Sequence, residues 1–322
     1  MGRWKGCRII GHPIGRYGVG LVLACSVLTT QATQPASANE RYASIVLDAE
    51  DMSVLHARNA DALRFPASLT KVMTLYMVFD ALEAGQLSLS DRIVMSKTAA
   101  SRPPSKLGLP PGSSLSVEDA IKALVAKSAN DVAAALGERL GGSEGRFAAL
   151  MTVKARSLGM SDTRFRNASG LPDQLQKTTA RDMARLADAL LIEHKAFYDY
   201  FGIKHMDWHG RRLANHNRLL SRVDGVDGIK TGYTRASGFN LMASAQRAGR
   251  RVIAIVMGGP SARARDDHMA ALLEAAFDEI ERAPTTSLAS VRGRYTEDQR
   301  VSFADNSTEP SPFGEGSVDG DR

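Results

Sequence analysis

Strand-like runs lie near both ends of this chain's foldable part, and helical periodicity fills the stretch between them. Residues 42–48 and 54–57 are rich in branched apolar side chains and predict two strands joined by a turn. β-character returns at residues 238–246 and 251–257, which predict two more strands. The sequence therefore predicts an α+β fold, in which an antiparallel sheet of N- and C-terminal strands is flanked by helices and carries an all-helical insert.

Apolar residues recur every three or four positions through the middle of the chain. This spacing predicts helices at residues 69–82, 117–125, 131–140, 145–158 and 180–191, and a last one at 267–280. Prolines and a glycine within residues 103–112 predict a long loop. With 43% hydrophobic and 24% charged residues in 322, the chain has enough apolar side chains to bury a sizeable core.

The first 38 residues have the layout of a secretory signal. Four basic residues precede an apolar run at 17–28, which is too short to span a bilayer, and small residues follow at 36–38. We expect a signal peptide at 1–38 and export to the periplasm or cell envelope. A retained N-terminal anchor and lipoprotein processing at Cys25 are the alternatives.

Removal of residues 1–38 changes the charge and the cysteine content. Lysine plus arginine falls from 41 to 37 against 35 acidic residues, which leaves a net charge of +2 instead of +6. Because no basic stripe with interleaved aromatics appears, no nucleic-acid partner is expected. Cys7 and Cys25 both leave with the signal, so the mature protein would have no thiol and no disulfide.

The end of the chain differs in composition from the rest. Residues 284–322 are rich in Ser, Pro, Gly and acidic side chains and have no apolar period, which predicts a disordered tail. The expected folded domain therefore spans residues 39–283, and no C-terminal membrane anchor is evident.

Ser68 and Lys71 form a candidate nucleophile and base. A hydroxyl attacks efficiently at neutral pH only when a nearby base takes its proton. Residues three apart share a helix face, so Lys71 would reach Ser68 at the start of the predicted helix. Alone, the Ser-x-x-Lys pattern is common, and Ser68 after Pro66 could simply cap that helix.

Two further short motifs follow along the chain. Ser128 and Asn130 lie in the polar break between two predicted helices, where either could be a helix cap instead. Lys230, Thr231 and Gly232 precede the strand predicted from residue 238. On an exposed strand edge they would offer a charge, a hydroxyl donor and close backbone approach to a peptide that bears a carboxylate.

The order and spacing of these motifs are those of penicillin-binding proteins and class A β-lactamases. The sequence around these motifs resembles the D-alanyl-D-alanine carboxypeptidase family of low-molecular-weight penicillin-binding proteins over residues 42–280. The matching stretches are Pro66-Ala67-Ser68-Leu69-Thr70-Lys71, Ser128-Ala129-Asn130-Asp131, Thr179-Ala180-Arg181-Asp182-Met183, Asp227-Gly228-Ile229-Lys230-Thr231-Gly232 and Met257-Gly258-Gly259.

The resemblance implies a role for each of these residues. Ser68 would attack the carbonyl of the penultimate D-alanine of a peptidoglycan stem peptide, with Lys71 as general base. Ser128 and Lys230 would relay the proton to the departing D-alanine, and Asn130 would hold the substrate amide. The rest of the implied substrate site consists of Thr231, Gly232, Tyr233 and Arg265. The backbone N–H of Tyr233 would complete the oxyanion hole with that of Ser68, and Arg263 is a rival to Arg265 in the loop after Met-Gly-Gly.

The resemblance also implies acylation by β-lactam antibiotics and no cofactor or metal. Two positions depart from the common family pattern, Ala129 in place of glycine and Tyr233 in place of histidine. Neither change removes an implied catalytic group, although Tyr233 would reshape the substrate rim. Many members add a β-rich domain and an amphipathic anchor, and nothing after residue 280 reads as either.

Other functions compete with this one. A class A β-lactamase needs a glutamate for deacylation, and none of Glu138, Glu144 and Glu193 has Asn four residues later. A zinc site would use His205, His209 and His216, but no glutamate lies between the first two. A penicillin-binding sensor or wall-binding module with little turnover, a D,D-endopeptidase and a weak transpeptidase would share the same site residues.

Overall fold

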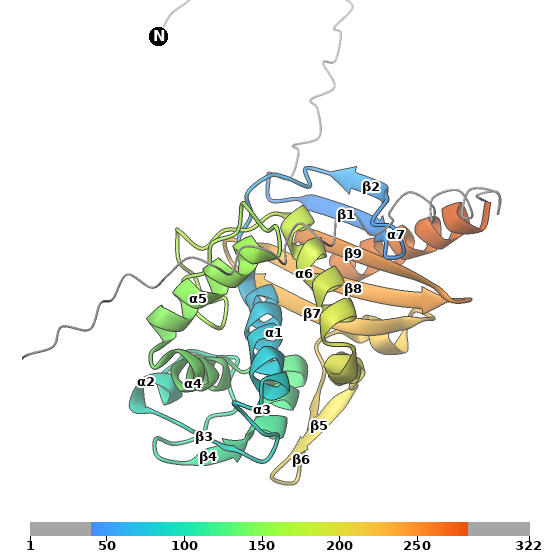
Figure 1. Cartoon of the computed structure of the whole chain (residues 1–322). Helices are drawn as coiled ribbons and strands as arrows, with labels where there is room; N and C mark the ends of the chain where they lie inside the picture. Colours follow the sequence, from blue (N-terminus) through green and yellow to red (C-terminus); the bar gives the residue numbers. More distant parts are fainter. Residues whose placement is uncertain (1–39, 283–322) are drawn as a thin grey trace, which may run out of the picture. The chain divides into compact units, whose positions relative to one another are not determined.

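The computed structural model describes residues 40–282, which are built around a five-stranded antiparallel sheet (Figure 1). In chain order its strands are β1 (Ala43–Asp48), β2 (Val54–Arg58), β7 (Val226–Thr234), β8 (Gly238–Arg247) and β9 (Arg250–Gly259). Their order across the sheet is β2-β1-β9-β8-β7, so β1 pairs with a strand from the far end of the domain. The predicted α+β fold is confirmed.

The sheet is covered on both faces. Successive side chains of a strand point to opposite faces, and those of β9 join two hydrophobic clusters. On one face Ile253, Ile255 and Met257 pack in the cluster that contains α6 (Ala180–Glu193). On the other face Val252, Ala254 and Val256 pack in the cluster that contains α7 (Ala262–Arg282). Burial on both faces explains why this strand has a continuous apolar run instead of an alternating pattern.

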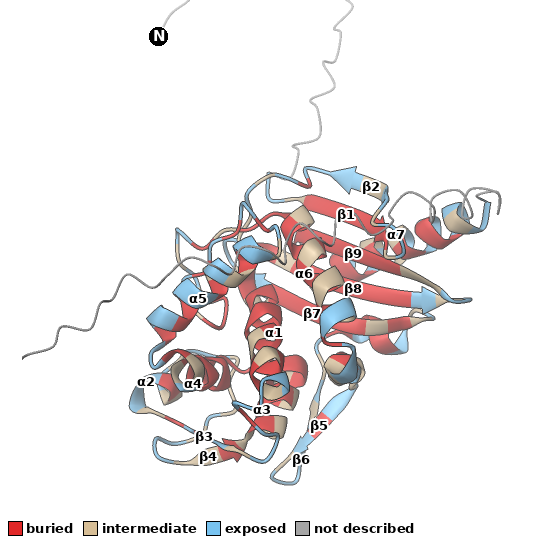
Figure 2. Ribbon diagram, in the orientation of Figure 1, coloured by how far each residue is buried: buried red, intermediate tan, exposed pale blue. Residues whose placement is uncertain are grey.

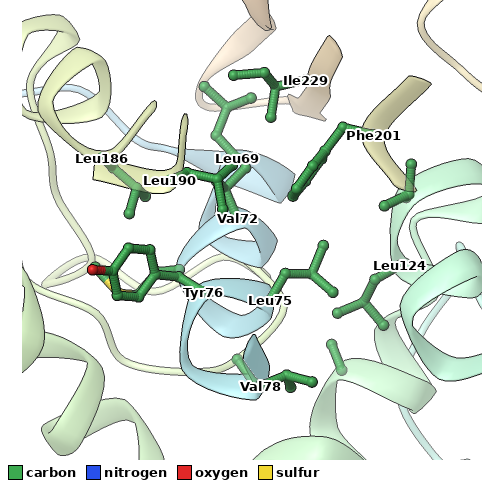
Figure 3. Close-up of a cluster of buried hydrophobic side chains, with 14 of the residues drawn as sticks. Leu69, Val72, Leu75, Tyr76, Val78, Leu124, Leu186, Leu190, Phe201 and Ile229 are labelled. Carbon is green, nitrogen blue, oxygen red and sulfur yellow. The ribbon is translucent and has the colours of Figure 1, made fainter. Parts of the chain in front are cut away.

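The helical insert is organised around α1 (Thr70–Glu83), which is buried along most of its length (Figure 2). Its apolar side chains surround the helix instead of forming one stripe, as expected for a helix inside a core. Figure 3 shows Val72, Leu75 and Tyr76 of α1 in one cluster with Leu186 and Leu190 of α6, Leu124, Phe201 and Ile229. The turn that carries Ser68 leads directly into this helix and is therefore held by a rigid, well-packed element.

Further strands and helices complete the insert. They are β3 (Arg92–Val94), α2 (Lys97–Ala100), β4 (Ser114–Ser116), α3 (Val117–Lys122), α4 (Asn130–Gly141) and α5 (Glu144–Ser157). The segment Ala123–Lys127 after α3 is a π-helix, and β5 (His205–Trp208) pairs with β6 (Arg211–Ala214) in a hairpin. The 3-10 helices are Ala67–Leu69, Lys195–Gly202 and Arg218–Ser221.

Several elements differ from the sequence predictions. Strands β3 to β7 were not predicted, because the first four are short and polar and β7 contains two glycines. The helix expected at 117–125 is an α-helix that continues as a π-helix. The last helix begins at Ala262, five residues before the predicted start.

The expected signal peptide at 1–38 with Cys25 and the expected tail at 284–322 both lie outside the described residues. Within residues 40–282, no helix is long and apolar enough to cross a membrane.

Candidate active site

Ser68 lies in the 3-10 turn Ala67–Leu69 that leads into α1, and its side chain does not cap that helix. The N-cap position of α1 is Leu69, which makes no side-chain capping bond. The capping alternative for Ser68 is therefore wrong. Its Oγ lies 3.1 Å from Nζ of Lys71 in the first turn of α1, which is the contact expected from the three-residue spacing.

Lys71 is completely buried, and its Nζ has two further partners. It donates to Oδ1 of Asn130 at 2.7 Å and to the carbonyl oxygen of Ser169 at 2.6 Å. Burial, followed by the field of the nearby Lys230 ammonium, holds the pKa of Lys71 well below its ordinary range. A neutral amine has two N–H bonds and one lone pair. Since Asn130 and Ser169 take the two N–H bonds, the lone pair is left for the Ser68 hydroxyl.

Ser128 and Asn130 stand at the break between the π-helix and α4. Ser128 has a left-handed backbone (φ 57°), and its buried Oγ has no hydrogen-bond partner among residues 40–282. The Asn130 side chain does not cap α4, whose N-cap is Ala129, but donates through Nδ2 to the carbonyl of Pro103 at 2.9 Å. The capping alternative for this motif is also wrong, and a buried hydroxyl is left free to meet a ligand.

Lys230, Thr231 and Gly232 lie within β7, an edge strand of the sheet, and not ahead of a strand as predicted. A Cβ added to Gly232 would lie 3.0 Å from the backbone nitrogen of Ser68 and 3.2 Å from the carbonyl oxygen of Pro66. The strand β7 and the turn that carries Ser68 thus approach so closely that a side chain at position 232 would crowd the backbone of the turn. The two implied oxyanion donors, the N–H groups of Ser68 and Tyr233, belong to these adjoining segments.

Lys230 is 1% exposed, and its Nζ donates to the carbonyl of Thr231 at 3.2 Å. Burial and then the charge of Arg265 lower the pKa of Lys230 to about 7. Near neutral pH both the amine and the ammonium form of Lys230 are therefore accessible. Lys230 can give up a proton or take one, as the implied relay requires.

Tyr233 and Arg265 occupy the wall on the α7 side. Tyr233 is 55% exposed and stacks on Phe239, with the ring centroids 4.2 Å apart. Arg265 lies in the first turns of α7, and not in a loop as predicted; its Nε and Nη2 donate to Asp266 Oδ1. The rival Arg263 points into solvent, with 91% of its side chain exposed, and faces Asp267 at 3.7 Å.

These residues converge on a cavity of about 670 Å³. The predicted residues that line it are Ser68, Ser128, Asn130, Thr231, Gly232, Tyr233 and Arg265. Lys71 and Lys230 are buried and are not part of this lining. The lining also includes His216, where desolvation and then the charge of Lys230 lower the pKa of the imidazole to about 4.

Sequence reasoning missed the segment that closes the site behind Lys71. Asn167 Oδ1 accepts hydrogen bonds from the backbone N–H groups of Ser169, Gly170 and Leu171 at 2.7–3.2 Å. Gly170 has φ +85°, and a Cβ there would lie 1.8 Å from the carbonyl oxygen of Ala67. Asn-Ala-Ser-Gly is a turn signal, but nothing local indicates which helix the turn contacts.

The rival sites find no support in this geometry. Across residues 40–282 no group of three His, Cys, Asp or Glu side chains is placed to hold a metal ion. The three candidate deacylating glutamates have other partners outside the cavity lining: Ser96 for Glu138, Arg102 for Glu144, and Tyr76 for Glu193.

Comparison with known proteins gives one consistent family. The sequence pattern of the D-alanyl-D-alanine carboxypeptidase family, peptidase S11, matches residues 29–261. The chain is 33% identical to D-alanyl-D-alanine carboxypeptidase DacF of Bacillus subtilis over 255 residues, 77% of this chain and 64% of the relative. It is 36% identical to DacC of Escherichia coli over 263 residues, 80% of this chain and 66% of the relative. It therefore spans just under two thirds of the length of these curated relatives.

Solved structures give the same result. Penicillin-binding protein 5 of Haemophilus influenzae superposes with a TM-score of 0.71 at 31% identity, over 76% of this chain and 72% of that one. Penicillin-binding protein D2 of Listeria monocytogenes, in its cefotaxime-bound form, gives a TM-score of 0.68 at 32% identity, over 77% of this chain and 100% of that one. By sequence pattern, by relatives and by fold, this chain belongs to the D-alanyl-D-alanine carboxypeptidase family of serine peptidases.

Proposed function

We propose that the protein is a serine-type D-Ala-D-Ala carboxypeptidase, which removes the terminal D-alanine from peptidoglycan stem peptides and is acylated by β-lactams. The observation that carries this proposal is the contact between Ser68 and a buried Lys71 whose other two hydrogen bonds go to fixed acceptors. Burial and the charge of Lys230 lower the pKa of this amine, which favours the neutral form that can take a proton from the hydroxyl, as acyl transfer to serine requires. The activity named for the relatives DacF and DacC, D-alanyl-D-alanine carboxypeptidase, supports the same reaction.

The reaction follows from these contacts. Ser68 Oγ bonds to the carbonyl carbon of the penultimate D-alanine as its proton passes to Lys71. The oxyanion is stabilised by the backbone N–H groups of Ser68 and Tyr233. Collapse breaks the C–N bond, and the departing amine takes a proton relayed by Ser128 and Lys230. Water then hydrolyses the ester and regenerates the hydroxyl. In a β-lactam the C–N bond also breaks, but the amine stays tethered to the acyl-enzyme.

The remaining parts of the proposal concern binding and location. Asn130 would hold the substrate amide, while Thr231 and Arg265 would face the terminal carboxylate from the cavity wall. The signal-like composition of residues 1–38 supports export to the periplasm or cell envelope.

The test uses the purified protein and its Ser68→Ala variant. A labelled penicillin and a diacetyl-lysyl-D-Ala-D-Ala peptide are offered in separate reactions. We expect covalent labelling and D-alanine release, both absent from the variant. Labelling without release would support the sensor alternative, and absence of both from the unaltered protein would overturn the proposal.

A further inference from the structure

A second concave surface lies on the solvent side of α5, away from the Ser68 site. It is a groove of about 440 Å³ between α5 and the segment that follows it, and its walls include Arg156, Arg164 and Arg166. The outward residues of α5 are exposed (Figure 2), among them Val153 with 65% exposure. No role in the proposed reaction uses these residues.

The groove carries uncompensated positive charge. Three arginines line it and no acidic residue does. Within residues 40–282, neither Arg156 nor Arg164 forms an ion pair, and Arg166 makes only a loose one with Asp173 at 3.6 Å between partly exposed groups. Partly exposed pairs of this kind contribute little, so most of the positive charge remains available to a ligand.

A larger concavity of the same protein shows the opposite arrangement. A separate cavity of about 990 Å³ is also lined by arginines, Arg250 and Arg251. Arg250 is paired with Asp48, and Arg251 donates to Asp227 at 2.7 Å. Arginines there are paired within the fold, whereas beside α5 only Arg166 has an acidic partner, the loose contact with Asp173.

The floor of the groove is rigid. Thr152 Oγ1 accepts a hydrogen bond from the backbone N–H of Phe165 at 3.0 Å and donates to the Ala148 carbonyl at 3.0 Å. The Phe165 side chain is 2% exposed and anchors this segment in the core. The backbone of Arg164 and Arg166, on either side of Phe165, is therefore held next to α5 before any ligand arrives, so that only their side chains have to be ordered on binding.

We infer that the α5 groove, defined by Arg156, Arg164 and Arg166, is a binding site for a phosphate-bearing ligand. A guanidinium group can donate two parallel N–H bonds to the oxygens of one phosphate. Three guanidinium groups therefore suit a phosphate, which has several oxygens and up to two negative charges, better than they suit a single carboxylate. Val153 at the edge offers an apolar surface to the ligand's carbon part. A soluble phosphate ester and a phospholipid headgroup present the same chemistry.

Two probes distinguish these sources. Calorimetry measures binding of glycerol 3-phosphate, and cosedimentation measures binding to vesicles of phosphatidylglycerol with phosphatidylcholine, against phosphatidylcholine alone. We expect saturable binding to at least one phosphate probe, weakened by added salt. Binding of the free ester assigns a soluble ligand, and binding of anionic vesicles alone assigns a lipid headgroup.

The decisive variant is Arg156→Gln with Arg164→Gln, and the matched control is Arg139→Gln on the exposed side of α4. The double variant should weaken binding by on the order of tenfold or more, because it removes two charge-assisted contacts. The control should bind as the unaltered protein does. Penicillin labelling of all three proteins reports that they are folded. Absence of saturable binding to both probes, or equal binding by the double variant, would overturn the inference.

Discussion

The carbonyl oxygen of Ser169 accepts a hydrogen bond from Nζ of Lys71 at 2.6 Å, across 98 residues of sequence. This contact gives the lysine a fixed third partner besides Ser68 and Asn130. Because the carbonyl cannot rotate away, it orients the amine toward the nucleophile. We expect the two buried lysines to have different roles because their partners differ: among residues 40–282, Nζ of Lys230 donates only to the carbonyl of its neighbour Thr231.

Replacement of each lysine by arginine should separate their roles. Lys71→Arg should reduce the rate of penicillin acylation by about three orders of magnitude or more, because a guanidinium stays protonated and cannot act as base. Lys230→Arg keeps the positive charge and should retain measurable acylation. Stopped-flow acylation rates compare them, with Ser68→Ala as the unlabelled control. A Lys71→Arg enzyme faster than Lys230→Arg would contradict these roles.

The pH dependence of peptide hydrolysis should have a falling limb set by Lys230. Its pKa of about 7 means that the ammonium is present below that pH and lost above it. Since kcat/KM reports groups of the free enzyme, kcat/KM for a peptide with a free carboxylate should decline as pH rises through about 7. Lys230→Arg should remove this limb. A limb that persists unchanged in that variant would show that another group titrates.

The same lysine should make the fold less stable at low pH. Its pKa is lower in the folded state than the ordinary 10.5, so the unfolded chain binds more protons between the two values, and stability rises with pH across that window. Lys230→Met should therefore raise the free energy of unfolding, by about 1–3 kcal/mol below pH 7, and the gain should shrink toward pH 10.5. Urea unfolding across this range measures it. A gain in the free energy of unfolding that does not depend on pH would contradict the lowered pKa of Lys230.

Gly170 should tolerate no side chain. Its φ of +85° and the 1.8 Å approach of a built Cβ to the Ala67 carbonyl mean that Gly170→Ala must displace the turn that carries Ser68. We expect a loss of at least about 2 kcal/mol in stability together with slower acylation.

Gly145→Ala is the matched control for that substitution. Gly145 lies in the first turn of α5, and a Cβ there would meet nothing within 4 Å. The substitution should be neutral or stabilising by up to about 1 kcal/mol. Thermal melts and penicillin labelling compare the two variants, and equal behaviour would refute the packing argument at Gly170.

The features that could be predicted from the sequence are those that depend on residues close together along the chain. The three-residue spacing of Ser68 and Lys71 brings them to one helix face without help from distant residues, and the branched runs at 43–48 and 250–259 determine two central strands. Motif order then led to the family. These features depend on neighbours in sequence, which is why they could be predicted.

Other features depend on distant segments and are visible only in the folded protein. Strand β7 has two glycines and weak strand propensity, and it becomes a strand because β8 supplies its hydrogen bonds. Arg265 lies in a helix because α7 extends back to Ala262. The lowered pKa of Lys71 arises from burial and from Lys230, and its orientation arises from Asn130 and Ser169. Desolvation and charge proximity are set by groups that meet only when the chain has folded, so no local pattern contains them.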